Sequence, residues 1–155
     1  MAGNVKKKRK SARSSPPMTR AMLLPMSFAL AQKISLKNHM ALVALRQGLG
    51  NLDLAGELLK TIFLVSYLVD EQTLSIHGAV FASSESTLRA LINCAASNGD
   101  WRLDDAQCPP IEAVLSLHDA QLAWLPTYLI DGAQRRLTRA FDCGSFPNLS
   151  LQTGL

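Results

Sequence analysis

The segment from residue 53 to residue 69 constrains the fold most, because it is apolar on more than one face at helical spacing. Its main stripe consists of Leu54, Leu58, Ile62, Val65 and Val69, and Leu59, Phe63 and Leu68 widen it. We therefore expect a central helix that neighbouring helices contact on several sides. A strand is the competing interpretation for the β-branched part 61–69, but the length of the whole segment favours a helix.

Four further segments carry apolar residues at helical spacing, and residues that begin or end helices separate them. The third of the five helices is expected to cover about twenty residues, after an interruption at 70–77. No series of alternating strands occurs, so the sequence predicts an all-α protein with a compact bundle of about five helices. The boundary signals are Ser27, Gly48, Gly50, Asn51, Asn98, Gly99, Pro109, Pro110 and Pro126.

The charge of the chain divides it into two parts. Residues 1–20 carry seven Lys or Arg and no acid, whereas residues 21–155 carry nine Lys or Arg against twelve acids, so the formal +4 is the sum of +7 and −3. The first part is also rich in Ser and Pro, a composition that cannot bury enough apolar surface to order itself. We expect a disordered basic arm at 1–20, a helical domain at 21–143 and a frayed tail at 144–155.

The basic arm suggests an affinity for phosphate. Residues 6–10 place five cations within about 17 Å of extended chain, a length comparable to several phosphates along one nucleic-acid strand. Arginines near the end of the last helix form a second basic feature. The predicted nucleic-acid-binding residues are Lys6, Lys7, Lys8, Arg9, Lys10, Arg13, Arg135, Arg136 and Arg139.

We therefore expect a non-enzymatic, nucleic-acid-associated accessory or regulatory protein of bacterial type, whose arm binds the DNA backbone without reading its sequence. An anionic membrane surface is another partner that the arm would suit. The alternative is a helical protein-interaction module that homo-oligomerises or docks a partner, through apolar surface left by the second helix or near Trp124. In that case the arm only solubilises the protein and the arginines form a solvated helix face.

Motifs that would indicate an enzyme or a bound cofactor are missing from the sequence. There is no nucleophile elbow, phosphate-binding loop or zinc-protease motif, and the histidines His39, His77 and His118 lack a second ligand at metal-binding spacing. We expect no catalytic residue, no metal, no cofactor and no small-molecule ligand. Three widely spaced cysteines, Cys94, Cys108 and Cys143, predict reduced and buried thiols.

The apolar run 62–69 is shorter than the roughly 20 residues that a membrane-spanning helix needs, and the chain shows no secretory signal. We expect a cytoplasmic protein.

Four short blocks resemble small proteins from beta- and gammaproteobacterial genomes and mobile elements, some of which are labelled Fis-family transcriptional regulators. The blocks are MTRAMLLP at 18–25, NHMAL at 38–42, GLGN at 48–51 and LHDAQL at 117–122. The resemblance implies a bacterial protein of the kind found on plasmids or integrated elements. A Fis-type domain reads DNA with a C-terminal helix-turn-helix, which the region around Pro126 does not reproduce, so no base-reading residues are carried over. The resemblance picks out His39, Asn51, His118, Asp119 and Gln121, for which we expect structural roles at helix junctions.

Overall fold

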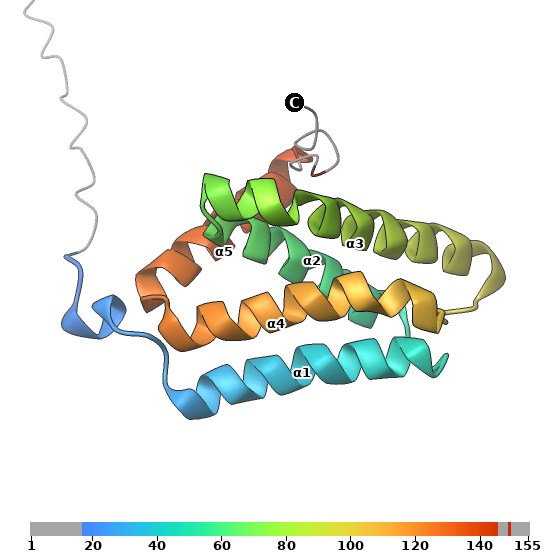
Figure 1. Ribbon diagram of the computed structural model, residues 1–155, viewed down its shortest axis with the longest axis horizontal. Coiled ribbons are helices and arrows are strands. Elements are labelled where there is room, and N and C mark those ends of the chain that lie inside the picture. Colours follow the sequence, from blue (N-terminus) through green and yellow to red (C-terminus); the bar gives the residue numbers. More distant parts are fainter. Residues whose placement is uncertain (1–16, 146–148, 150–155) are drawn as a thin grey trace, which may run out of the picture.

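The computed structural model describes residues 17–145 and residue 149, and this part of the chain folds into five α-helices and two short 3-10 helices without strands (Figure 1). The elements are η1 (Arg20–Leu23), α1 (Phe28–Arg46), α2 (Leu52–Leu68), α3 (Glu71–Asn98), η2 (Asp105–Gln107), α4 (Cys108–Trp124) and α5 (Thr127–Cys143). The predicted all-α class and number of helices are confirmed. The predicted arm residues from Lys6 to Arg13 lie outside the described residues.

The α2 helix occupies the centre of the bundle, where it contacts α1, α3, α4 and α5. The expectation of a central helix is therefore confirmed, because its apolar faces meet four neighbours. Figure 1 shows α1 and α4 side by side and running in opposite directions. The fully buried α2 side chains include Leu58, Ile62, Phe63 and Val65.

Local capping explains most helix boundaries. Ser27 accepts a hydrogen bond from the backbone N–H of Leu30 at 3.4 Å and begins α1, and Asn51 begins α2 in the same way by accepting from Leu54 at 2.9 Å. The first turn of α4 contains Pro109, which loses no helical hydrogen bond there. These starts lie where the sequence predicts them.

The start of α3 differs from the expectation. The interruption predicted at 70–77 is wrong, because α3 begins at Glu71 and continues for 28 residues. Asp70 caps it by accepting a hydrogen bond from the N–H of Thr73 at 2.7 Å. The first turns expose most of their side chains, and glycine occupies the buried position 78 between Leu74 and Phe81, so the apolar stripe of this helix is interrupted where the sequence predicts a break.

The end of the chain and the cysteines also differ from expectation. Gly144 ends α5 in the left-handed conformation, yet Leu149 is only 2% exposed and packs in the hydrophobic core. The predicted tail 144–155 therefore contributes one core side chain. Of the three thiols expected to be buried, only Cys108 is, while Cys94 and Cys143 are exposed.

Candidate functional site

The outer face of α5 carries charge that the rest of the helical body does not neutralise. Arg135, Arg136 and Arg139 are exposed, and none of them forms an ion pair with a carboxylate of the described residues. By contrast, the cations elsewhere that do pair with acids are Lys37, Arg46, Lys60 and Arg89. Six Lys or Arg of residues 17–145 form no ion pair within the described part of the chain, and three of them thus lie within two turns of one helix.

A groove between α2 and α5 adjoins these arginines. It has a volume of about 440 Å³, and its lining includes Tyr67, Tyr128, Arg135 and Arg136. The Arg136 guanidinium lies 4.3 Å from the centre of the Tyr67 ring, a cation–π contact that orients the guanidinium without neutralising its charge. Partial burial raises the pKa of the Tyr67 hydroxyl, and the charge of Arg136 opposes this shift. The arrangement combines cations with aromatic rings, as nucleic-acid-binding surfaces do.

The segment that leads out of the basic arm is anchored beside the first turn of α5. The backbone N–H and the hydroxyl of Thr127 both donate to the carbonyl of Leu24 at 2.9 Å, and Pro25 forms an isolated bridge with Pro126. Arg20, the last residue of the predicted arm, begins η1, which contacts α5 (Figure 1). The root of the arm and the α5 arginines therefore belong to neighbouring elements.

Four of the five residues picked out by the resemblance, namely His39, Asn51, Asp119 and Gln121, begin a helix or join two helices. Nε2 of His39 on α1 is 2.8 Å from a carboxylate oxygen of Asp119 on α4, and the Gln121 amide donates to the carbonyl of Val65 on α2 at 3.3 Å. With the Asn51 cap, these contacts agree with the expected structural roles. Asp119 thus faces a histidine eighty positions away instead of its sequence neighbour His118.

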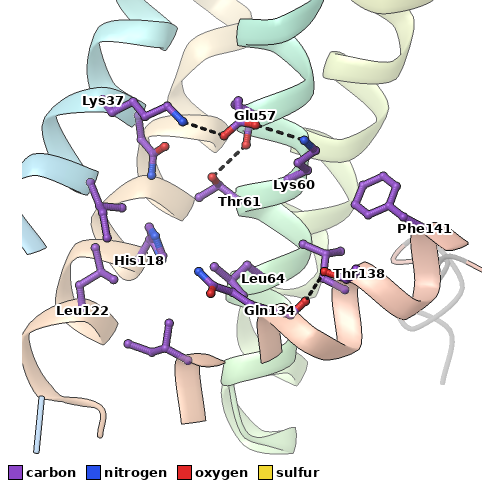
Figure 2. Close-up of a pocket in the computed structure, with 14 residues that line it drawn as sticks. Lys37, Glu57, Lys60, Thr61, Leu64, His118, Leu122, Gln134, Thr138 and Phe141 are labelled. Carbon is purple, nitrogen blue, oxygen red and sulfur yellow. Dashed lines mark hydrogen bonds and ion pairs between the residues drawn. The ribbon is translucent and has the colours of Figure 1, made fainter. Parts of the chain in front are cut away.

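A second hollow opens on the surface of the bundle, and no sequence motif signals it. It has a volume of about 640 Å³ and is lined by residues of α1, α2, α4 and α5 (Figure 2). At its rim, Glu57 accepts hydrogen bonds from Lys37 at 2.9 Å and Lys60 at 3.1 Å, and the Lys37 hydrogen bond is the main reason that the pKa of Glu57 is lowered.

Three buried polar side chains, Asn38, Thr61 and His118, line this hollow. The Thr61 hydroxyl donates to the carbonyl of Glu57 at 2.9 Å. Asn38 is 5% exposed and His118 is 2% exposed. The Asn38 Nδ2, the His118 Nδ1 and the Gln121 Oε1 are buried without a hydrogen-bond partner within 3.5 Å among the described residues, and the Gln121 side chain lies close enough to His118 to influence its pKa.

Burial lowers the pKa of His118, against the opposing influence of Asp119 and Gln121. The imidazole of this residue is therefore neutral at neutral pH.

Among residues 17–145 and 149, no helix combines the length and apolarity needed to cross a membrane, and no group of three or more His, Cys, Asp or Glu is arranged to hold a metal ion. Comparisons of the chain with protein-family models, curated proteins and solved structures find no match.

Proposed function

We propose that this chain is a nucleic-acid-associated accessory or regulatory protein that binds the phosphate backbone through its basic arm and the arginine face of α5. The observation that carries the proposal is the unneutralised charge of Arg135, Arg136 and Arg139 beside the Tyr67 ring. Exposed guanidinium groups attract phosphate, and neighbouring aromatic rings offer stacking surfaces for unpaired bases.

The anchoring of the arm supports a common binding surface. Because Leu24 is hydrogen-bonded to Thr127 at the start of α5, the chain enters the helical body next to the helix that carries the arginines. An arm rooted there can follow the phosphates of a strand that α5 also contacts. In this arrangement the arm supplies most of the affinity and α5 fixes the orientation of the body.

The salt dependence of binding tests the proposal. Fluorescence anisotropy with a random-sequence duplex would compare the full chain with a variant in which the six cations between residues 6 and 13 are replaced by Gln. The slope of log K against log salt is expected to become shallower by up to about 5, since each neutralised phosphate contributes about −0.9. An unchanged affinity and slope would reject nucleic-acid binding by the arm.

A second pair of variants tests the α5 face. The double variant that combines Arg135→Gln with Arg139→Gln is expected to make the slope of log K against log salt shallower by about 2. This variant leaves the Arg136 contact with Tyr67 in place. The matched control is Lys33→Gln combined with Arg102→Gln, which removes the same charge from two other unpaired exposed cations. Equal effects of the two pairs would show that α5 contributes only net charge and is no binding face.

An exposed apolar stripe on α1 favours a second candidate function, a homo-oligomerising interaction module. Leu36, Met40 and Val43 follow one another at steps of four and three residues and are 62%, 56% and 39% exposed. Trp124, at 81% exposed, also fits this alternative. The second helix fits it less well, because Leu52 is its only large apolar residue among the exposed ones.

Light scattering of the full chain distinguishes this second candidate. A dimer that Met40→Lys converts to a monomer would support association through the stripe, because the new ammonium group would have to be desolvated in the interface. A wild-type chain that stays monomeric at high concentration would exclude it.

A further inference from the structure

The groove between α2 and α5 brings aromatic rings and cations together in one space. It lies beside the last turn of α2 and the first half of α5, and its volume is about 440 Å³. The residues that give it this character are Tyr67 from α2 and Tyr128, Arg135 and Arg136 from α5. No carboxylate of the described residues belongs to its lining. The groove therefore suits a flat ring that is attached to negative charge.

The contact between Arg136 and Tyr67 prepares one surface of this groove. The Arg136 guanidinium lies over the Tyr67 ring, with its central carbon 4.3 Å from the ring centre. The cation–π attraction orients the guanidinium, although Arg136 is exposed and forms no ion pair with a carboxylate of the described residues. Unpaired nucleic-acid bases stack on aromatic rings and on guanidinium planes. Tyr67 thus holds Arg136 as a stacking surface.

Gly132 leaves open space on the same face of α5. Tyr128, Gly132 and Arg136 follow one another at steps of four residues, so they share this face. A Cβ built at Gly132 would meet no other side chain within 4 Å. The space between the Tyr128 ring and the Arg136 guanidinium is therefore not filled by the protein at this position.

The cations beside the groove suit the phosphates on either side of a base. Arg135 lines the groove, and Arg139 lies one turn further along the exposed surface of α5. The acids of this helix, Asp131 and Asp142, form no ion pair with the arginines and do not line the groove. A base inside a duplex is stacked and paired, and extruding it costs free energy. The groove therefore favours a strand whose bases are already unpaired.

We propose that the groove between α2 and α5 holds one unpaired base of a single-stranded nucleic acid. This inference rests on the proposed function and names the class of nucleic acid that the α5 face takes. Arg136, oriented by Tyr67, and Tyr128 contact the base, and Arg135 and Arg139 contact the flanking phosphates. Stacking of this kind tolerates any base, so the site discriminates strand structure instead of sequence.

A matched set of strands tests the proposal on the full chain by fluorescence anisotropy. A short thymidine oligonucleotide is compared with an abasic strand of the same length, which carries the same phosphates without bases. The thymidine strand is expected to bind about tenfold more tightly, since stacking one base contributes at least that much. The slope of log K against log salt is expected to be the same for both strands. At high salt, where the attraction between charges is weak, the thymidine strand should also bind more tightly than a duplex of that length.

Two variants with matched controls locate the base. Arg136→Lys keeps the charge and removes the guanidinium plane, so it should lose most of the preference for the thymidine strand, whereas Arg139→Lys outside the groove should keep it. Gly132→Leu fills the open space without changing the charge and should also lose the preference. Gly56→Leu, at another helical glycine with open space around its Cβ, should keep it. Both leucine variants are expected to fold, because leucine favours a helix over glycine.

The wild-type comparison decides the outcome even where a variant fails to fold. Equal affinity for the thymidine and abasic strands overturns the inference and leaves the proposed function standing if the duplex still binds through the arm. A preference that survives both Arg136→Lys and Gly132→Leu overturns it as well, because the base would then lie elsewhere. Competition by thymidine monophosphate at the concentration of the strand itself also overturns it, since the site would then take a free nucleotide. Absence of binding to every strand and to the duplex would reject the inference and the proposed function together.

Discussion

His118 couples the stability of the bundle to pH. Because burial lowers its pKa, the folded protein binds the imidazole proton less tightly than the unfolded chain does. The stabilising effect of the neutral ring is complete above the unfolded pKa of about 6.5 and declines as the pH falls from there towards the folded pKa. We expect the free energy of unfolding to fall over this range by at most about 1.4 kcal/mol per pH unit from this residue.

Chemical denaturation at pH 7.5, 6.5 and 5.5 measures this effect. His118→Gln keeps a polar side chain without a titrating proton and should flatten the decline. His77→Gln, at an exposed position of α3, is the matched control for the loss of an imidazole. Equal slopes in the wild type and in His118→Gln would contradict the prediction, as would an NMR titration midpoint of His118 above 6.5.

The loop between α1 and α2 needs glycine at two positions for different reasons. Gly48 has a φ of 73°, a left-handed conformation that side chains with a Cβ disfavour. At Gly50 a Cβ would press on the fully buried Leu45 side chain and lie 3.1 Å from the carbonyl oxygen of Trp101. The first requirement is conformational and the second is steric.

Alanine substitutions separate these two requirements. Gly48→Ala is expected to lower the free energy of unfolding by about 1 kcal/mol through backbone strain. Gly50→Ala is expected to lower it by about 2 kcal/mol, because the core must shift to admit the methyl group. Gly56→Ala, within α2 and with open space around the new Cβ, should instead raise it by about 0.5 kcal/mol. Urea denaturation that gave all three variants the same sign would refute this account.

At the scale of elements, Asp70 determines where α3 begins. Its carboxylate accepts from the N–H of Thr73, and hydrogen bonds from this residue hold the pKa of Asp70 below its ordinary value. The cap is therefore effective above the unfolded pKa and is lost as the pH falls through the folded pKa. Asp70→Ala should increase the rate of backbone amide hydrogen exchange about fivefold in the first two turns of α3, while amides near Phe81 should keep their protection.

Asp70→Asn provides the matched control for this cap. The amide oxygen accepts the same hydrogen bond without titrating, so the first turns should stay protected at low pH, unlike those of the wild type. Identical exchange in the wild type and in Asp70→Ala would mean that packing alone fixes the start of α3.

The elements that the sequence predicts well are those with local signals. The α2 helix carries its apolar stripe within one segment, and the starts of α1 and α4 carry Ser27 and Pro109. The first turns of α3 are missed because the buried position 78 is a glycine, which interrupts the apolar stripe between Leu74 and Phe81. The hollow lined by Asn38 and His118 is missed because these residues lie eighty positions apart, and only the antiparallel packing of α1 against α4 brings them to one space.

At the scale of the whole molecule, the fold extends past the end of α5. Leu149 is 2% exposed and belongs to the same core as the central helices, although the chain between Ser145 and this residue lies outside the described part. The side chain of Leu149, which follows the last helix in sequence, therefore completes the packing of the core. The stability of the body therefore depends on a residue that the sequence assigns to a frayed tail.

Two leucine truncations test where the domain ends. Leu149→Ala is expected to lower the free energy of unfolding by about 2 kcal/mol or more, because it removes buried methyl groups and leaves a void. Leu49→Ala, at a loop position that is 72% exposed, should change it by less than about 0.5 kcal/mol. Urea denaturation compares the two directly. If Leu149→Ala were as mild as Leu49→Ala, the core would be complete at α5 and the chain after Gly144 would be dispensable for folding.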